Sequence, residues 1–370
     1  MKKILLISFE YPLGKKYCGG VGQIVKSSNE LLASLGHEVY VLITDRFNKK
    51  HPVKLLLPDG SLKDYPSLHS FQKKYPWRDY DYIIHHFVNW ANEFRKIKKL
   101  SGIGPKIFYH FHSILRREKE SGFDTRNHFL RNQEKMIEIS DRVICPSRYE
   151  YENFMRYFPY FSDKVVLMEN TIEPILADRS LINRIKDFHK IKKKDIISIY
   201  VGRLERIKGA HILLRHLPSV LTKYKSHKLF IIGKPLERKI YRQLIALKKR
   251  FPQRLIYIRY LEKDLLYQYY YLSHIYINTS LSESFSLSTH EGAFCSNALL
   301  LNRLPVFDKF QNAALFFSNC NEDNGDSFIE QYKKLAESQH LRSRLSKKAV
   351  DIAGGCISQS RLRESFSKIL

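Results

Sequence analysis

The sequence predicts an α/β protein with two Rossmann-like domains, each a doubly wound parallel sheet. Short β-branched and aromatic runs alternate with helical patterns along most of the chain, as they do in parallel sheets. The 370 residues exceed what one hydrophobic core usually holds. The alternation loosens once, between residues 176 and 194, where basic residues replace the apolar pattern. We therefore expect an N-terminal domain over 1–175, a linker over 176–194 and a C-terminal domain over 195–370.

Hydrophobic periodicity predicts the individual elements. In the first domain we expect strands at 4–9, 38–44, 53–57, 81–87, 106–112, 142–146 and 164–168, and helices at 24–35, 126–139 and 148–157. In the second domain we expect strands at 196–201, 228–232, 254–258, 274–279 and 298–301, and helices at 209–224, 235–250, 263–272, 287–296 and over most of 326–370. We allow for a last helix that packs back on the N-terminal domain.

Composition limits the classes of partner. Lysine and arginine number 63 against 37 aspartate and glutamate residues, a net charge of +26. This excess favours phosphorylated ligands, nucleic acid or an acidic membrane leaflet, but dispersed basic residues are equally typical of solvated faces. Five scattered cysteines without metal-ligand spacing favour a reducing compartment, and we expect a cytoplasmic protein.

Two carboxylates lie beside the carboxyl end of a predicted strand in the second domain. Glu283 follows the strand at 274–279, and Glu291 lies in the helix that begins near Ser286. Open α/β sheets bind ligands at this edge, and a helix N-terminus attracts anions such as phosphate. Carboxylates that can bind hydroxyl groups, next to a site for phosphate, suggest that the ligand is a sugar nucleotide. For Glu291 the helix dipole offers a structural alternative.

Two cations follow the first strand of the same domain. Arg203 and Lys208 lie between that strand and the helix that begins near Gly209. The planar guanidinium of Arg203 can bind a phosphate through two parallel hydrogen bonds, and Lys208 adds a compact charge. An exposed basic loop is the simpler explanation for such a pair taken alone.

These motifs, in this order, resemble the retaining glycosyltransferases of the GT-B fold, glycosyltransferase family 4 (group 1). The resemblance covers nearly the whole chain. Its segments are Gly19–Gly22, Phe111–Ser113, Ser140–Ser147, Glu169–Glu173, Gly202–Gly209 and Glu283–Glu291.

The resemblance implies two domains that face each other across a cleft, with catalytic residues His112, Arg203, Lys208 and Glu283. Arg203 and Lys208 would hold the donor diphosphate and stabilise the leaving group, Glu283 would bind hydroxyls of the transferred sugar, and His112 would lie near that sugar. No metal or cofactor is implied, because the two cations neutralise the diphosphate. The implied donor-binding residues are Gly19, Gly20, Arg203, Lys208, Phe285, Ser286, Leu287, Ser288 and Glu291, the last on the ribose.

Some of these residues have simpler explanations. His112 could be a core histidine, and Gly19-Gly20 could form a turn without a ligand. The family usually has glycine where this chain has Ser286 and Ser296, and we expect a Cβ at Ser286 to alter the donor site. A GT-B-like binding protein with weakened or lost catalysis is therefore an alternative.

The expected partners are a nucleotide-sugar donor and a saccharide or lipid-linked acceptor, and we expect a role in bacterial cell-surface polysaccharide or glycan synthesis. A basic amphipathic stretch, with Phe87, Trp90, Phe94 and Ile97 on one face, suggests contact with an anionic membrane at its inner face, although an ordinary packed helix has the same pattern. A nucleic-acid-binding protein is the alternative of another class, but the sequence lacks its usual motifs.

Overall fold

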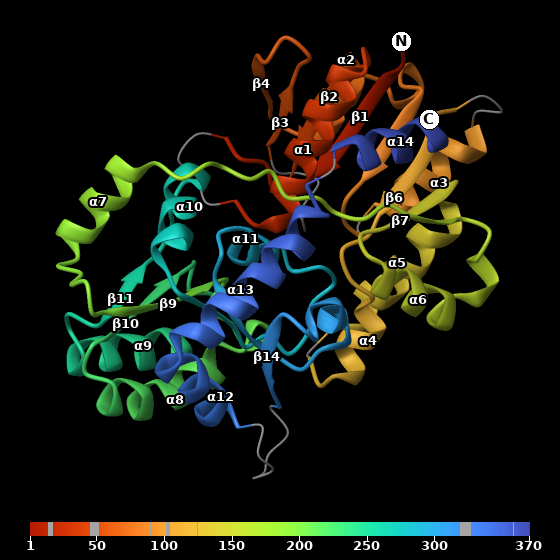
Figure 1. The fold of residues 1–370 in the computed structure, drawn as a ribbon. Helices are drawn as coiled ribbons and strands as arrows, with labels where there is room; N and C mark the ends of the chain where they lie inside the picture. The colour runs from red at the N-terminus through yellow and green to blue at the C-terminus, as the bar shows by residue number, and fades with distance from the viewer. Residues whose placement is uncertain are drawn as a thin grey trace. The chain divides into compact units, whose positions relative to one another are not determined.

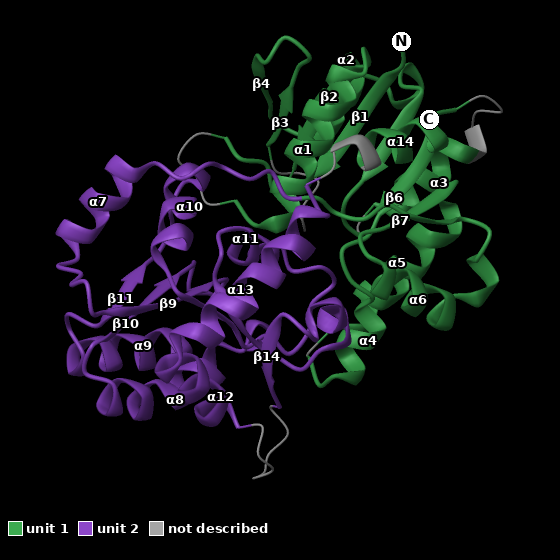
Figure 2. Cartoon of the chain, in the orientation of Figure 1, with its two compact units in different colours: residues 1–171, 358–370 green, residues 172–357 purple. Residues whose placement is uncertain are grey.

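The computed structural model describes residues 1–13, 18–44, 52–88, 90–100, 104–123, 125–318, 327–357 and 359–370 (Figure 1). They form two compact units (Figure 2). Unit 1 comprises Met1–Thr171 together with Ser358–Leu370, and unit 2 comprises Ile172–Ile357. Each unit is built around its own sheet.

The segment expected to be a linker contains a helix instead. Helix α7 (Arg179–Phe188) begins after Asp178, whose side chain accepts a hydrogen bond from the Leu181 backbone N–H at 3.0 Å. Ile185 on its inner face is buried. The N-cap and the burial of Ile185 hold the helix against the rest of unit 2, and its exposed residues are polar apart from Phe188.

Unit 1 contains an eight-stranded sheet in the order β4-β3-β2-β1-β5-β6-β7-β8. The six strands from β2 to β8 in this order pair in parallel, and β3 pairs antiparallel with both β2 and β4. The strands are β1 (Lys3–Ser8), β2 (Glu38–Ile43), β3 (Val53–Leu56), β4 (Leu62–Tyr65), β5 (Tyr82–His85), β6 (Lys106–His110), β7 (Arg142–Cys145) and β8 (Val165–Leu167).

The β3–β4 hairpin departs from the all-parallel sheet that the sequence predicted, and β4 was not predicted at all. Strand β4 is mostly exposed, so it lacks the apolar alternation by which strands are found. The signal for it lay in the turn. Gly60 has a positive φ of +82°, and the Asp59 carboxylate accepts hydrogen bonds from the Ser61 backbone at 2.9 Å and hydroxyl at 2.6 Å.

Both faces of this sheet are covered by helices. Ile4 and Leu6 face one hydrophobic cluster, and Leu5 and Ile7 face another, since alternate residues of a strand point to opposite faces. The first cluster includes residues of α1 (Gly20–Ser34) and α14 (Gln359–Ile369), so the end of the chain packs within unit 1. The remaining helices of this unit are α2 (Leu68–Lys74), α3 (Ala91–Leu100), α4 (Leu115–Glu120), α5 (Asn127–Ile139) and α6 (Arg148–Tyr157).

The amphipathic stretch that contains helix α3 uses its apolar face inside the unit. Phe87, Trp90 and Phe94 are at most 5% exposed and belong to the core cluster. On the polar side, Arg95 pairs with Glu138 at 2.7 Å and Lys98 with Asp141 at 2.7 Å. The structure therefore favours the packed helix over the membrane-bound one for this stretch.

Unit 2 contains a six-stranded parallel sheet in the order β11-β10-β9-β12-β13-β14. The adjacency of β9 and β12 places the loops that follow these two strands side by side at the carboxyl edge. The strands are β9 (Ile196–Val201), β10 (His227–Ile232), β11 (Leu255–Ile258), β12 (Ile275–Asn278), β13 (Ala298–Asn302) and the unpredicted β14 (Ala314–Phe317). The helices besides α7 are α8 (Ala210–Lys223), α9 (Arg238–Arg250), α10 (Lys263–Leu272), α11 (Leu287–Phe294), α12 (Phe328–Glu337) and α13 (Gln339–Gly354).

Among the described residues, no helix has both the length and the apolar character needed to cross a membrane.

The end of α11 yields a stability prediction. Ser296 follows the helix with a left-handed φ of +62° and is exposed, a conformation that a Cβ makes unfavourable. We expect Ser296→Gly to raise the free energy of unfolding by about 1 kcal/mol. Urea unfolding measures the change, with Ser296→Ala as the control that keeps the Cβ. Equal unfolding midpoints for the glycine and alanine variants would contradict this explanation.

Candidate active site

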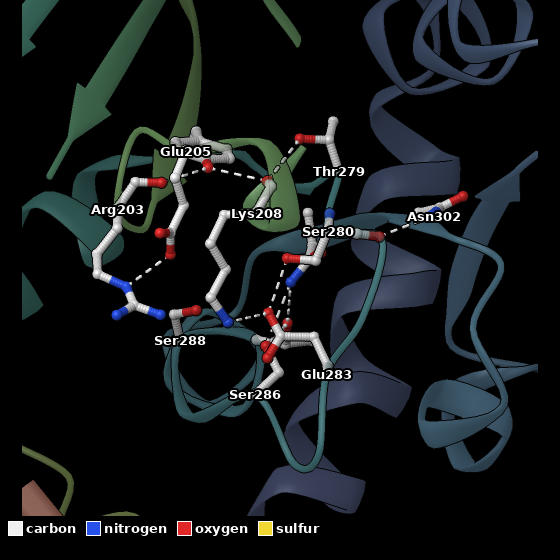
Figure 3. A network of polar contacts seen from close by, with 12 residues as sticks. Arg203, Glu205, Lys208, Thr279, Ser280, Glu283, Ser286, Ser288 and Asn302 are labelled. Atoms are coloured by element: carbon white, nitrogen blue, oxygen red, sulfur yellow. Dashed lines mark hydrogen bonds and ion pairs between the residues drawn. The ribbon is translucent and has the colours of Figure 1, made fainter. Parts of the chain in front are cut away.

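An ion pair joins the loops after β9 and β12. Lys208 Nζ lies 2.9 Å from Glu283 Oε1, and the Ser280 hydroxyl donates to the same oxygen at 2.7 Å (Figure 3). The side chain of Glu283 is only 8% exposed and that of Lys208 25%. A carboxylate so little exposed has its charge stabilised by the ammonium and the hydroxyl rather than by water. The structure thus brings together two predicted catalytic residues.

The two loops meet because one glycine permits a close backbone contact. A Cβ on Gly209 would lie 1.6 Å from the Thr279 carbonyl oxygen, and Gly209 has a φ of +65°. The Thr279 hydroxyl donates to the Gly209 carbonyl at 2.9 Å. Glycine is required here because a Cβ would clash and because the backbone is left-handed. The contact fixes the position of the neighbouring Lys208 backbone relative to the sheet.

Arg203 lies on the same β9 loop. Its Nε is 2.8 Å from Glu205 Oε1, and its side chain is 37% exposed (Figure 3). The buried Tyr200 hydroxyl donates to the Lys208 carbonyl at 3.0 Å, which ties the end of the loop to strand β9. The loop therefore presents two cations, one held by Glu205 and one by Glu283.

The start of α11 is built around Ser286. This residue has a left-handed conformation, φ +65° and ψ +76°, and is 8% exposed. Its hydroxyl lies 2.8 Å from the Thr289 hydroxyl and accepts a hydrogen bond from Asn278 Nδ2 at 3.2 Å. Asn278 also donates to Thr289 at 3.1 Å and accepts from the Ser280 backbone N–H at 2.8 Å. Ser286 thus adopts the conformation for which glycine is usual, and its hydroxyl is bound within the protein.

The other predicted donor-binding residues at the start of this helix differ in how deeply they are buried. The ring of Phe285 is 2% exposed and stacks on His290 at 4.1 Å, so it supports the loop from inside. Ser288 is half-buried and accepts a hydrogen bond from the Tyr276 hydroxyl at 2.8 Å. Leu287, the first residue of the helix, is half-buried as well. A ligand at this helix start would therefore meet backbone groups more than the Phe285 side chain.

Glu291 lies on α11, one to two turns beyond Ser286. Its Oε2 accepts a hydrogen bond from the Tyr270 hydroxyl at 3.3 Å. Burial raises the pKa of this carboxyl, while the charge of Lys263 and the Tyr270 hydrogen bond act in the opposite direction. The residue as a whole is half-buried.

Three predicted site residues belong to unit 1. The Gly19 backbone N–H donates to Glu10 Oε2 at 3.1 Å, and a Cβ on Gly19 would lie 2.6 Å from that oxygen. Gly20 begins α1. The preceding loop residues 14–17 lie outside the described part of the chain. His112 follows β6, and its Nε2 lies 3.2 Å from Nδ1 of His86. The structure supplies a polar partner for both the Gly19 backbone and the His112 ring.

The sequence analysis missed the residues that hold these groups in place. They are Glu10, His86, Glu205, Tyr270, Tyr276, Asn278, Ser280, Thr289 and Asn302. Asn278 carried a signal, since an asparagine at the end of an otherwise apolar buried strand needs polar partners. Asn302 donates to the Ser280 carbonyl at 2.7 Å, a contact between β13 and the β12 loop that only strand order reveals.

No group of three or more His, Cys, Asp or Glu side chains that could hold a metal ion is found within the described ranges.

Comparison with protein families gives two matches that together follow the two units. The family described as Glycosyltransferase Family 4 matches residues 18–175. The family described as Glycosyl transferases group 1 matches residues 182–351. A search of the curated proteins found no match to the sequence.

Solved structures share the fold at low sequence identity. Sucrose-phosphate synthase from Thermosynechococcus elongatus has a TM-score of 0.77 and 14% identity, with 100% of this chain and 98% of that chain covered. The trehalose-6-phosphate synthase OtsA has a TM-score of 0.73 and 12% identity, with 100% and 98% covered. HepE from Anabaena, in complex with UDP and glucose, has a TM-score of 0.69 and 14% identity, with 100% and 99% covered.

The hydrogen bonds of Ser286 yield a second stability prediction. Ser286→Ala keeps the left-handed Cβ but removes the hydroxyl, so we expect the free energy of unfolding to fall by about 1–2 kcal/mol. Ser286→Gly loses the same hydrogen bonds but relieves about 1 kcal/mol of backbone strain. Its free energy of unfolding should therefore fall by less than that of Ser286→Ala. Urea midpoints rank the three proteins. An alanine variant as stable as the wild type would show that the hydroxyl contributes nothing.

Proposed function

Because the chain belongs to the family 4 glycosyltransferases of the GT-B fold, we propose that it transfers a sugar, with retention of configuration, from a nucleoside-diphosphate donor. The acceptor is a saccharide or a lipid-linked saccharide, in the synthesis of bacterial cell-surface polysaccharide or glycan. The observation that carries the proposal is the Lys208–Glu283 pair at the carboxyl edge of the unit 2 sheet, beside the start of α11.

The cations of the β9 loop suit a diphosphate. An ammonium group has three hydrogens, so Lys208 can keep its bond to Glu283 and still donate to a phosphate oxygen. The Arg203–Glu205 ion pair involves Nε, and the two terminal nitrogens of the guanidinium form the fork that binds phosphate. In the transition state both cations stabilise the charge that develops on the leaving diphosphate. We propose that this charge stabilisation replaces a metal ion.

The carboxylates suit the two sugars of the donor. Glu283 is fixed at Oε1 by Lys208 and Ser280, which orients the carboxylate for hydroxyls of the transferred sugar. Glu291 would accept hydrogen bonds from the ribose, with Tyr270 orienting it from behind. The first turn of α11 would contribute backbone N–H groups and the positive end of its dipole to the diphosphate.

Nucleotide binding and two variants test this function. In a thermal-shift screen of UDP, GDP, ADP, CMP and a DNA oligomer, we expect one of the nucleoside diphosphates alone to raise the melting temperature. Glu283→Ala should abolish transfer from the corresponding nucleotide sugar but keep nucleotide binding. Lys208→Ala should weaken binding by roughly 10- to 100-fold, the value of a charge-assisted hydrogen bond, and lower transfer as well.

Arg206→Ala is the matched control, since it removes an exposed positive charge from the same turn but leaves the Lys208–Glu283 pair intact. It should bind and transfer as the wild type does. Full activity of Glu283→Ala would refute the site assignment, and stabilisation by DNA alone would refute the function. Nucleotide binding without transfer in the wild type would favour the binding-protein alternative.

We also propose a peripheral association with anionic lipid, which rests on the net charge of +26 now that the apolar face of α3 is buried. Sedimentation with liposomes should show binding that increases with the fraction of anionic lipid and falls with added salt. Equal partitioning on neutral and anionic liposomes would exclude the association.

A further inference from the structure

Helix α9 of unit 2 exposes only positive charges to solvent. Its 13 residues contain no carboxylate. The basic residues, all of them exposed, are Arg238, Lys239, Arg242, Lys248, Lys249 and Arg250. The opposite side of the helix is buried, because Ile240 and Leu244 pack in the core cluster of unit 2. Helix α9 also packs beside α8 and against β11 (Figure 1). The apolar residues thus fix the helix in the unit, and the cations face outward.

Three of these cations point in one direction. Arg238, Arg242 and Lys249 are four and seven residues apart, which is about one and two turns of an α-helix, so their side chains leave the same side. That side lies roughly opposite the buried Ile240 and Leu244. Within the described part of the chain, none of the six basic residues of α9 forms an ion pair. Their charge is therefore available to an anionic surface.

Apolar atoms lie between the cations. An open hollow of about 330 Å³ is lined by Tyr241, Arg242, Ile245, Ala246 and Lys249. Most of its surface is apolar, since long basic side chains contribute their methylene groups and keep the charged end in water. Two larger apolar side chains are exposed beside it, Tyr241 at 38% and Leu236, which precedes the helix, at 48%. We call this surface, with Arg238, the outer face of α9.

We propose that the outer face of α9 is the surface that binds an anionic lipid leaflet. The cations Arg238, Arg242 and Lys249 contact the lipid phosphates, and Tyr241 and Leu236 enter the headgroup region. A leaflet offers negative charge and an apolar layer beneath it, which matches both components of this face. Tyrosine is also favoured at the boundary between lipid and water. A nucleic-acid backbone would pair with the cations but leave the apolar hollow without a partner.

The start of α9 is tied to the loop that carries the donor cations. The Leu204 backbone N–H donates to the Lys234 carbonyl at 2.9 Å, and the Leu236 N–H donates to the Leu204 carbonyl at 3.2 Å. Leu204 directly follows Arg203 in the chain. Binding through α9 therefore holds the β9 loop close to the leaflet that would contain a lipid-linked acceptor. The inference rests on the proposed association with anionic lipid and names the surface responsible for it.

Sedimentation with vesicles tests the surface. The triple variant Arg238→Gln, Arg242→Gln, Lys249→Gln keeps good helix formers and removes three charges from the outer face. Its partitioning onto vesicles of equal parts phosphatidylcholine and phosphatidylglycerol should fall about 100-fold, because each cation near an anionic leaflet contributes a factor of about five. Its nucleotide binding should match that of the wild type.

A second triple variant controls for net charge. Arg344→Gln, Lys347→Gln, Lys348→Gln removes three exposed charges from α13 of the same unit. All six substituted positions are exposed, so both variants should unfold at the wild-type urea midpoint. The α13 variant should keep most of the lipid binding. An equal loss in the two variants would show that net charge alone determines binding, and would overturn the proposal.

A tryptophan at residue 236 tests contact with the acyl chains. The native Trp77 and Trp90 are buried in unit 1 at 9% and 5% exposed, so a change in emission on binding reports on Leu236→Trp. We expect its emission to shift to shorter wavelength on the anionic vesicles and to be quenched by brominated acyl chains. Lipid binding without this quenching would overturn the proposal. So would a DNA oligomer whose binding is lost in the α9 variant while lipid binding is kept.

The outcomes separate this surface from the proposed function. If the wild type binds neither neutral nor anionic vesicles, the lipid association and its surface fail together, and the nucleotide screen with Glu283→Ala still decides the transfer reaction. If the wild type binds anionic vesicles and the α9 variant binds them equally well, the surface fails alone.

Discussion

The backbone contact between Gly209 and Thr279 is the constraint on which the site in unit 2 depends. It joins the loop after β9 to the loop after β12, with a separation that leaves no room for a Cβ. Thr279 strengthens the contact by donating to the Gly209 carbonyl, and Tyr200 holds the adjoining Lys208 carbonyl from below. Both backbones are fixed by this contact, and the Lys208 side chain is already paired with Glu283. The Lys208 side chain therefore loses little conformational entropy when a ligand binds.

A network of small polar side chains supports the second half of the site. Asn278, Ser286 and Thr289 satisfy one another's hydrogen bonds beneath the first turn of α11. Such a network is favourable only when every member is paired, because an unpaired polar group in the interior is costly. The serine that departs from the family pattern is thus part of a local adaptation. Its hydroxyl offsets the strain of its left-handed backbone and points into the protein.

The predicted site residues of unit 1, His112 and Gly19, have imidazole and carboxylate neighbours rather than cations. The carboxyl edge of this unit's sheet brings the imidazole rings of His86, His110 and His112 together, and burial keeps the His86 and His110 rings uncharged at neutral pH. Glu10 has a comparable part at the start of α1, where its carboxylate accepts the Gly19 backbone N–H. In both places a polar residue just beyond the end of one strand contacts a group on a later segment of the chain.

The amino-acid sequence determined where most of the strands and helices lie, because hydrophobic periodicity and turn residues are local properties. It also indicated the β9 loop cations and the two carboxylates near α11, since these lie at strand ends that the pattern marks. It did not predict β4 or β14, whose residues have little apolar alternation or lie beyond the expected sheet.

Only the tertiary structure decided which of these residues meet. Lys208 and Glu283 are 75 residues apart in the chain, and they touch because β9 and β12 are neighbours in the sheet. His86 and His112 meet for the same reason at β5 and β6. The left-handed conformation of Ser286 likewise depends on Asn278 and Thr289. Strand order and side-chain networks arise from contacts between distant segments, and local periodicity does not encode them.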